Sequence, residues 1–422
     1  MRVVKRTLLA TLVLLSVTAS AVLLLIFDAG PTVTRPGEVS VADVQRARAL
    51  LLRHDPRRVP DGVAQRVMLT PQDVTLLAQY AASRWRRAAA SVHLRDGAAR
   101  VQVSVAVPGM PLRRWLNVQA TLRDAAGLPE VQTLRIGRLP VPDALAQPVT
   151  AFLVARLGAD LPLALARDMT QTVAFMPSAV VISYRWQVGA TDRVRDMLMP
   201  PDDLARLEAA NADLARVLAS QRGGGALSLA ILLPPLLTSA ARRASVGDLV
   251  AEQRAVLATL ALYVNGQRMS RWAQQASDWP QPPFRPVTLG GRPDLAKHFL
   301  VSAVVAAQAG SPLADAVGRT KEVDDARRGT GFSFADLAAD RAGTLLGELA
   351  SASPQALADA AAVGLAESDI MPSVADLPEQ MNTEQFQARF GGIGAPAYAA
   401  MMRTIEQRLA RLPLYRGRAL TR

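Results

Sequence analysis

The sequence predicts an α+β fold with an N-terminal transmembrane helix, an antiparallel-sheet domain with flanking helices, and an all-α C-terminal domain. An uncharged apolar run opens the chain, segments that alternate apolar and polar residues follow it, and only helical patterns occur beyond residue 200. The 422 residues exceed the roughly 250–300 that one hydrophobic core organises, so several domains are expected. The expected boundaries are 1–28 for the cytoplasmic N-terminus and transmembrane anchor, 29–40 for a linker, 41–199 for the α+β membrane-proximal domain and 200–422 for the all-α domain.

The composition excludes several classes of protein. Hydrophobic residues make up 50% of the chain and charged residues 20%, which excludes a disordered, highly charged polypeptide. The absence of cysteine excludes disulfides, thiolate metal sites and cysteine nucleophiles. The net charge of +12 comes mainly from scattered arginines and aromatic residues are only 5%, so no nucleic-acid partner is expected.

The N-terminal residues predict a membrane anchor. The uncharged run from Thr7 to Phe27 is long enough to cross roughly 30 Å of hydrocarbon as a helix. Basic residues before the run and Asp28 after it favour a cytoplasmic N-terminus. Cleavage as a signal peptide near Ala19-Ser20-Ala21 is the alternative, but it would leave a strongly apolar new N-terminus. We therefore expect a single-pass protein of the bacterial inner membrane, with its bulk in the periplasm and membrane lipid as a partner of the anchor.

The elements of the α+β domain follow in order. Val41 to Leu52 has a helical pattern. Thr70, Pro71 and Asp73 begin a second helix, because threonine caps, proline suits the first turn and aspartate complements the positive helix end. Several strands in succession predict an antiparallel sheet with helices on one side. The remaining elements are strands at 101–107, 116–122, 131–137 and 180–186, a hairpin turn at Asp96-Gly97 and a helical stretch at 144–168.

This region resembles small membrane-anchored envelope proteins of the YpmS-like kind. The shared features are the anchor, the helix start Leu69–Asp73, the strand meander and the segment Leu134–Pro142. The resemblance extends over residues 60–190 and implies an envelope location but no activity.

Helices are expected throughout the second domain. Asp202 to Gln221 has apolar residues at a helical spacing and ends at a run of three glycines. One interpretation is an amphipathic helix packed on its own domain, and the other is a dimer seam in which Asn211 occupies a core position. Ala226 to Ala240 is apolar but too short to span a bilayer, so a buried helix or an interfacial segment is expected. Further helices are expected at 250–264 and from Asp294 onward.

One block of polar residues stands out in this domain. His298 lies on an apolar helix, Glu322 and Asp325 share a face of a second helix, and Asp336 and Asp340 share a face of a third. Ser333 caps the third helix, and the small residues Ala339, Gly343 and Gly347 at four-residue spacing allow a close helix approach.

The block resembles the YfiM-like periplasmic proteins and, more distantly, the VanZ-like family. The residues that carry the resemblance are His298, Gly318, Lys321, Glu322, Asp325, Gly329, Gly331, Ser333, Asp336, Leu337, Asp340 and Gly343. The VanZ-like version lies within transmembrane helices that this chain lacks, so the link of that family to glycopeptide resistance does not carry over. The resemblance implies an uncharacterised family of anchored proteobacterial envelope proteins.

Two interpretations of the block are open. In the first, its carboxylates pair with Lys297, Lys321 and Arg341 as a structural clamp, because buried charges must be paired. In the second, His298 and the carboxylates bind a divalent metal or perform acid–base chemistry. The clamp is favoured, since one histidine with carboxylates is a small ligand set. No other cofactor is expected, and no other catalytic motif is present.

The predicted function is a non-enzymatic envelope scaffold or ligand-binding protein. The alternatives are an envelope hydrolase or metal-dependent enzyme that uses His298 and the nearby carboxylates, and a lipid-handling module in which the sheet domain or Ala226–Ala240 holds an acyl chain. An envelope protein or a lipid is the expected class of partner. The sequence specifies neither a reaction nor an oligomeric state.

Overall fold

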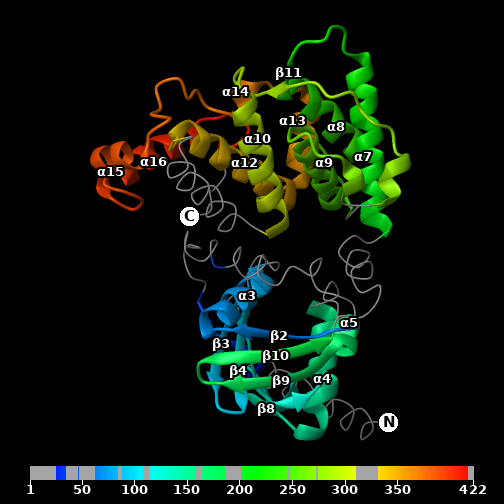
Figure 1. Ribbon diagram of the computed structural model, residues 1–422, viewed down its shortest axis with the longest axis vertical. Coiled ribbons are helices and arrows are strands. Elements are labelled where there is room, and N and C mark those ends of the chain that lie inside the picture. Colours follow the sequence, from blue (N-terminus) through cyan, green and yellow to red (C-terminus); the bar gives the residue numbers. More distant parts are fainter. Residues whose placement is uncertain are drawn as a thin grey trace, which may run out of the picture. The chain divides into compact units, whose positions relative to one another are not determined.

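The computed structural model divides into two compact units, which comprise residues 1–36 with 46–198 and residues 37–45 with 199–422 (Figure 1). The fold is α+β, with antiparallel sheets in unit 1 and helices in both units. No helix among the described residues is both long and apolar enough to cross a membrane. Most of the run from Thr7 to Phe27 and of the expected helix 41–52 lies outside the described residues. The structure describes residues 25–34, 46, 62–83, 88–107, 115–157, 163–185, 201–244, 248–271, 274–309 and 331–416.

Unit 1 contains two antiparallel sheets where the sequence predicts one. The four predicted strands and the Asp96-Gly97 turn are confirmed, but they belong to different sheets. The first sheet has the order β3 (Ala88–Arg95), β4 (Ala98–Ala106), β5 (Trp115–Arg123), β7 (Glu130–Ile136) and β8 (Leu139–Val141). The second has the order β2 (Ala64–Leu69), β10 (Ala179–Arg185), β9 (Thr170–Met176) and β6 (Ala125–Ala126).

The chain passes from one sheet to the other at Asp124. Asp124 follows β5, and its carboxylate accepts a hydrogen bond of 2.7 Å from the Phe175 amide in β9. Side chains from both sheets, including Ala99 and Phe175, form a small core in this unit. The helices among the described residues of unit 1 are α3 (Pro71–Ser83), α4 (Asp143–Leu157) and α5 (Leu163–Met169).

The predicted cap of α3 is confirmed. Thr70 Oγ1 accepts from the Asp73 amide at 3.2 Å, and Asp73 Oδ2 accepts from the Thr70 amide at 2.9 Å. These reciprocal bonds satisfy backbone donors that the first helical turn leaves without partners.

The first described segment of the chain is bound to the first sheet. β1 (Phe27–Asp28) pairs with the start of β5, with Phe27 opposite Leu116. Gly137, at the turn between β7 and β8, has φ +56°, and a Cβ there would lie 2.4 Å from the carbonyl oxygens of Leu25 and Ile26. The described part of the expected 29–40 linker is also attached to the sheet and does not form a separate spacer. The Gly30 carbonyl accepts from the Asn117 side chain, and the Val33 amide donates to Ser104.

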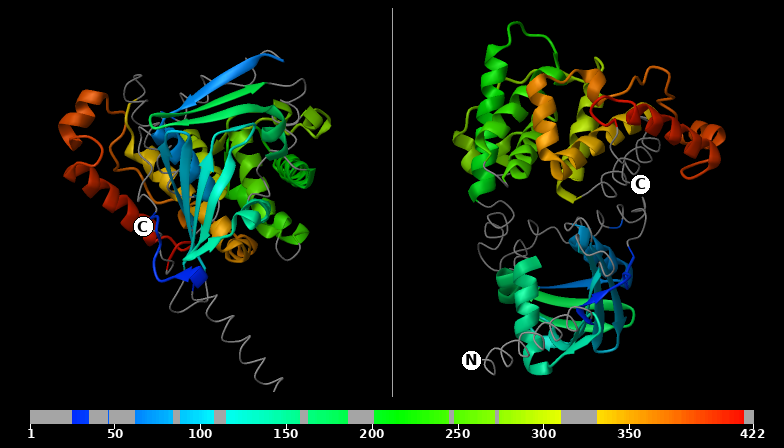
Figure 2. Two further views of the ribbon diagram at one scale, coloured as in Figure 1. Left: turned by 90° about the horizontal axis from the view of Figure 1, so that it is seen from below. Right: turned by 180° about the vertical axis from the view of Figure 1, so that it is seen from behind.

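Unit 2 is a helical assembly with one small exception. Two short strands, β11 (Leu227–Ser228) and β12 (Val287–Thr288), pair in parallel, which the all-helical prediction does not include. The longer helices are α7 (Pro201–Ser220), α8 (Leu229–Arg243), α9 (Leu249–Val264), α10 (Pro293–Ala309), α12 (Phe334–Ala352) and α16 (Pro396–Ala410). The shorter ones are α13 (Pro354–Val363), α14 (Glu367–Ile370) and α15 (Thr383–Phe390). Figure 2 gives two further views of these elements.

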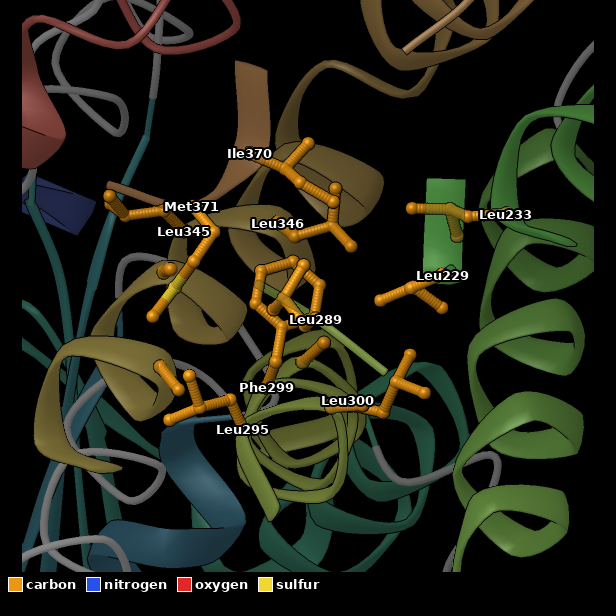
Figure 3. Close-up of a cluster of buried hydrophobic side chains, with 14 of the residues drawn as sticks. Leu229, Leu233, Leu289, Leu295, Phe299, Leu300, Leu345, Leu346, Ile370 and Met371 are labelled. Atoms are coloured by element: carbon orange, nitrogen blue, oxygen red, sulfur yellow. The ribbon is translucent and has the colours of Figure 1, made fainter. Parts of the chain in front are cut away.

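The core of unit 2 is built around α8, α9, α10 and α12 (Figure 3). Leu229 and Leu233 of α8 and Phe299 of α10 are all 0% exposed. The segment Ala226–Ala240 is therefore mostly a core helix, as one of its two interpretations predicts. Its role as an acyl-chain holder is a prediction that the packing contradicts, because its leucines are already buried against protein.

Asn211 does not face a second chain through an exposed seam. It is 6% exposed, and its side-chain amide donates to the Pro280 carbonyl at 2.7 Å. The neighbouring Leu214 and Leu218 lie in the core of the same unit. The interpretation of α7 as an amphipathic helix packed on its own domain is confirmed, and the dimer-seam interpretation is wrong for these residues.

Candidate functional site

The polar block lies where α10 and α12 pack closely against each other. A Cβ on Gly343 would lie 1.9 Å from the Phe299 carbonyl oxygen, and a Cβ on Gly347 would lie 2.2 Å from that of Ala303. The small residues therefore allow the two backbones to touch, as their spacing predicts. Ser333 caps α12, since its hydroxyl accepts from the Asp336 amide at 3.0 Å.

His298 lies between two aspartates in this helix pair. Its Nδ1 is 3.2 Å from Asp340 Oδ1, and its Nε2 is 3.2 Å from Asp336 Oδ2. Ser302, one turn beyond His298 on α10, donates its hydroxyl to Asp340 Oδ1 at 2.7 Å. His298 is 7% exposed and Asp340 is 5% exposed, so the cluster is largely removed from water. The structure thus brings together three of the five residues that the sequence singled out.

The geometry favours a protonated histidine. Each ring nitrogen faces a carboxylate oxygen, and only the imidazolium ion donates from both nitrogens. Burial acts to lower the pKa of His298, but hydrogen bonds and charge attraction from Asp336 and Asp340 outweigh it and raise the pKa to about 10. His298 is therefore a cation at neutral pH.

An arginine that the sequence did not single out lies beside this cluster. Arg292, just before α10, places Nη2 3.8 Å from Asp336 Oδ1. The same guanidinium binds Asp294 at 2.6 Å and Glu379 at 2.7 Å. Among the described residues, Asp336 Oδ1 and Asp340 Oδ2 are buried without a hydrogen-bond partner. The carboxylates are thus held mainly by His298, Ser302 and Arg292.

The other predicted members of the clamp are placed differently. Lys297 is exposed on α10. Arg341 binds Glu406 of α16 at 2.5 Å instead of the two aspartates. Glu322, Asp325 and Lys321 lie outside the described residues. Among the described residues, the clamp therefore uses His298 and Arg292, and not Lys297 or Arg341 as the sequence predicted.

The arrangement favours the clamp over acid–base chemistry. A general base needs a free lone pair, and the carboxylates beside both ring nitrogens of His298 favour the imidazolium form, which has none. Ser302 directs its proton to Asp340 instead of to His298, so the pair of nucleophile and base is not formed. Within the described part of the chain, no three or more His, Asp or Glu side chains are arranged to hold a metal ion.

A second charged cluster was not predicted from the sequence. Arg243 of α8 pairs with Asp213 of α7 and lies 3.0 Å from Glu252 of α9. Both acids are buried, at 5% and 7% exposed. The sequence signal for this cluster was the position of the two acidic residues on otherwise apolar helix faces. A buried acidic side chain needs a positively charged or hydrogen-bonding partner.

Unit 2 also contains a pocket of about 560 Å³ between α7, α9 and the loop before β12. Apolar side chains such as Leu262 and Phe284 line it together with polar ones such as Asn211. Thr259 lines it as well, is 2% exposed, and has no hydrogen-bond partner for its hydroxyl among the described residues. The volume lies within the range of small-molecule sites.

Comparison with known proteins gives no match for this chain, whether with protein-family models, with curated proteins or with solved structures.

Proposed function

We propose that the chain is a single-pass inner-membrane protein with a periplasmic ectodomain that acts as a non-enzymatic envelope scaffold. The observation that carries the proposal is the attachment of residues 25–28, where the uncharged run ends, to the first sheet of unit 1. Phe27 belongs to strand β1, so the part of the run left to span the bilayer ends before Leu25. Folded structure that begins at the end of such a run suits a domain held at the membrane surface. The imidazolium clamp supports a structural role for the polar block.

Fusion to alkaline phosphatase tests the anchor and its direction. A C-terminal fusion should be active and should sediment with membranes, because the basic residues before the run favour a cytoplasmic N-terminus. A matched fusion that carries Leu14→Arg and Leu15→Arg should lose the membrane association. Phosphatase activity in the soluble periplasmic fraction of the unaltered fusion would contradict the anchor and favour cleavage near Ala19-Ser20-Ala21.

A second candidate function is ligand binding, which the pocket at Thr259 favours. The pocket has the volume of a small-molecule site and combines apolar walls such as Leu262 and Phe284 with polar side chains such as Asn211 and Gln281. Native mass spectrometry of the full chain, released from detergent, should then detect a bound small molecule. Thr259→Val keeps the side-chain shape and should abolish that mass, whereas Thr404→Val at an exposed site should not. Equal bound mass in both variants would exclude this pocket as the site.

A further inference from the structure

The helix α4 carries an exposed apolar stripe. Leu145 is 52% exposed and Phe152 is 60% exposed, although both are large apolar side chains. Residues seven apart lie on the same face of a helix, so these two side chains point in a similar direction. Ala144, Pro148 and Ala151 are also exposed and lie along one side of the line that joins Leu145 and Phe152. The stripe is thus continuous over two helical turns and contains no charge.

The stripe begins close to the point where the chain enters unit 1. The Leu25 carbonyl accepts from the Arg138 amide at 2.8 Å, at the turn between β7 and β8. Asp143, where α4 begins, is only five positions after Arg138 in the chain. Five residues span at most about 18 Å even when fully extended. The start of α4 therefore lies within that distance of the end of the uncharged run.

The position of Leu25 in unit 1 is held by several bonds. The side-chain amide of Asn117 donates to Asp28 Oδ2 at 2.8 Å and to the Gly30 carbonyl at 3.0 Å. Ser104 Oγ accepts from the Val33 amide at 3.0 Å. The segment is thus attached on both sides of β1, so the place where the run meets the sheet is determined by the fold.

We propose that α4 lies on the surface of the bilayer in which the chain's own N-terminal run is anchored, with the stripe of Ala144, Leu145, Pro148, Ala151 and Phe152 in the headgroup and acyl boundary. This inference rests on the proposed anchor. An apolar helix face buried about 5–10 Å into that boundary is a known mode of interfacial binding. The exposed Arg135 and Arg138 on the adjacent hairpin suit anionic headgroups, since each nearby cation contributes about 1 kcal/mol.

The opposite end of the sheet provides a matched control. The Gly97 amide donates to the Phe175 carbonyl at 3.0 Å, and the Gly97 carbonyl accepts from the Asp124 amide at 3.2 Å. Met176 therefore lies beside the far end of β5, about 24 Å along the strand from Leu116, where β1 pairs. Met176 is 42% exposed, so it is an accessible apolar side chain that this orientation places away from the lipid.

The absence of cysteine allows a direct test with single labels on the full chain. Leu145→Cys, Ala151→Cys and Met176→Cys are each labelled with an NBD fluorophore and reconstituted into vesicles of phosphatidylethanolamine and phosphatidylglycerol. Doxyl-labelled lipid should quench the labels at 145 and 151 about threefold more than the label at 176, with a blue-shifted emission at the first two positions.

Each outcome has a separate meaning. Equal quenching at all three positions, or none at 145 and 151 while the protein floats with the vesicles, would overturn the orientation of α4 but leave the anchor intact. A blue shift at 145 without lipid quenching would assign the stripe to a protein contact and would also overturn it. Protein that does not float with the vesicles would overturn the proposed anchor itself.

Discussion

Each unit contains a buried polar cluster, and the two clusters connect different kinds of segment. In unit 2, His298 and two aspartates connect helices α10 and α12, which both belong to the core. In unit 1, Asn117 and Ser104 connect the strands β4 and β5 to the N-terminal segment. The first cluster is ionic, whereas the second consists mainly of neutral groups and backbone amides.

This difference has energetic consequences. Removal of one member of a buried ion pair leaves a charge without compensation and costs about 3–5 kcal/mol. Loss of neutral hydrogen bonds at the end of the central strands β4 and β5 costs less, because water can replace the lost partners of the released segment. We therefore expect changes in the His298 cluster to unfold unit 2, and changes at Asn117 to detach one segment while the sheet remains.

The largest effect is expected for Asp340→Asn. The substitution keeps the side-chain shape but removes a charge that His298 needs, so the free energy of unfolding should fall by about 3–5 kcal/mol. Denaturant unfolding of the full chain measures it. Asp359→Asn, at an exposed position that accepts from Gln355, should change stability by less than about 0.5 kcal/mol.

Complementation of a deletion strain distinguishes a structural clamp from a catalytic or metal site. His298→Ala and Asp336→Ala should both melt early, and a higher expression level should restore function. If either variant melts normally yet does not complement the deletion, the cluster has a functional role and the comparison between the two units must be revised.

Dependence on pH should distinguish the ionic cluster from the neutral one. The pKa of His298 is raised from 6.5 to about 10 in the folded chain, so its proton stabilises the fold fully below about pH 6.5. This contribution, on the order of 3–5 kcal/mol, is lost as the pH rises through about 10. Unfolding measured from pH 6 to pH 10 should lose less stability in His298→Gln than in the unaltered chain. Parallel curves for the two proteins would show that His298 is not a buried cation.

A smaller effect is expected for Asn117→Ala. The change removes donors to Asp28 and Gly30 and an acceptor for Ser104, at a cost of about 1–3 kcal/mol in unit 1. Hydrogen exchange of the Thr32 and Val33 amides should become faster, while exchange in the middle of β4 should not. Gln119→Ala on the same strand is the control, because Gln119 only accepts from Gln102 at 3.3 Å. Equal exchange at Val33 in both variants would contradict the role of Asn117.

The smallest effect is expected for Asn211→Leu. The mass of the full chain in light scattering should remain unchanged, because Asn211 binds Pro280 of its own unit. Stability should fall by about 1 kcal/mol through the lost hydrogen bond. A change in mass would contradict the placement of Asn211 against Pro280 of its own unit.

Local chemistry explains what the sequence could predict. Thr70 and Ser333 cap helices because their hydroxyls reach backbone amides two or three residues away, and the pattern carries that information. The spacing of Gly343 and Gly347 likewise predicts that another helix can approach closely, although it does not specify that this helix is α10. The caps and the small-residue face depend only on neighbours within one or two turns.

Long-range partners could not be predicted in the same way. Asn117 binds residues far earlier in the chain, and a period of two in β5 does not specify which segment will pair with its start. The second sheet joins β2 to β10 and β9, which lie about a hundred residues further along the chain, and the hydrogen bond from Phe175 to Asp124 joins it to the end of β5; no alternating pattern encodes these partners. At the candidate site, the atoms that face the two ring nitrogens of His298 determine whether this residue is a neutral base or a cation. Only the three-dimensional arrangement shows which atoms these are.

The attachment of residues 25–33 to the sheet has a mechanical consequence. A tension applied to the chain at Leu25 meets the bond to Arg138, the β1 ladder and the Asn117 cluster within a few residues. No unattached residues lie between Leu25 and the first sheet, so the sheet bears the force at once. A displacement of Leu25 is therefore transmitted directly to unit 1. The rigidity of the strands, and not the length of a flexible spacer, limits how far unit 1 can tilt relative to Leu25.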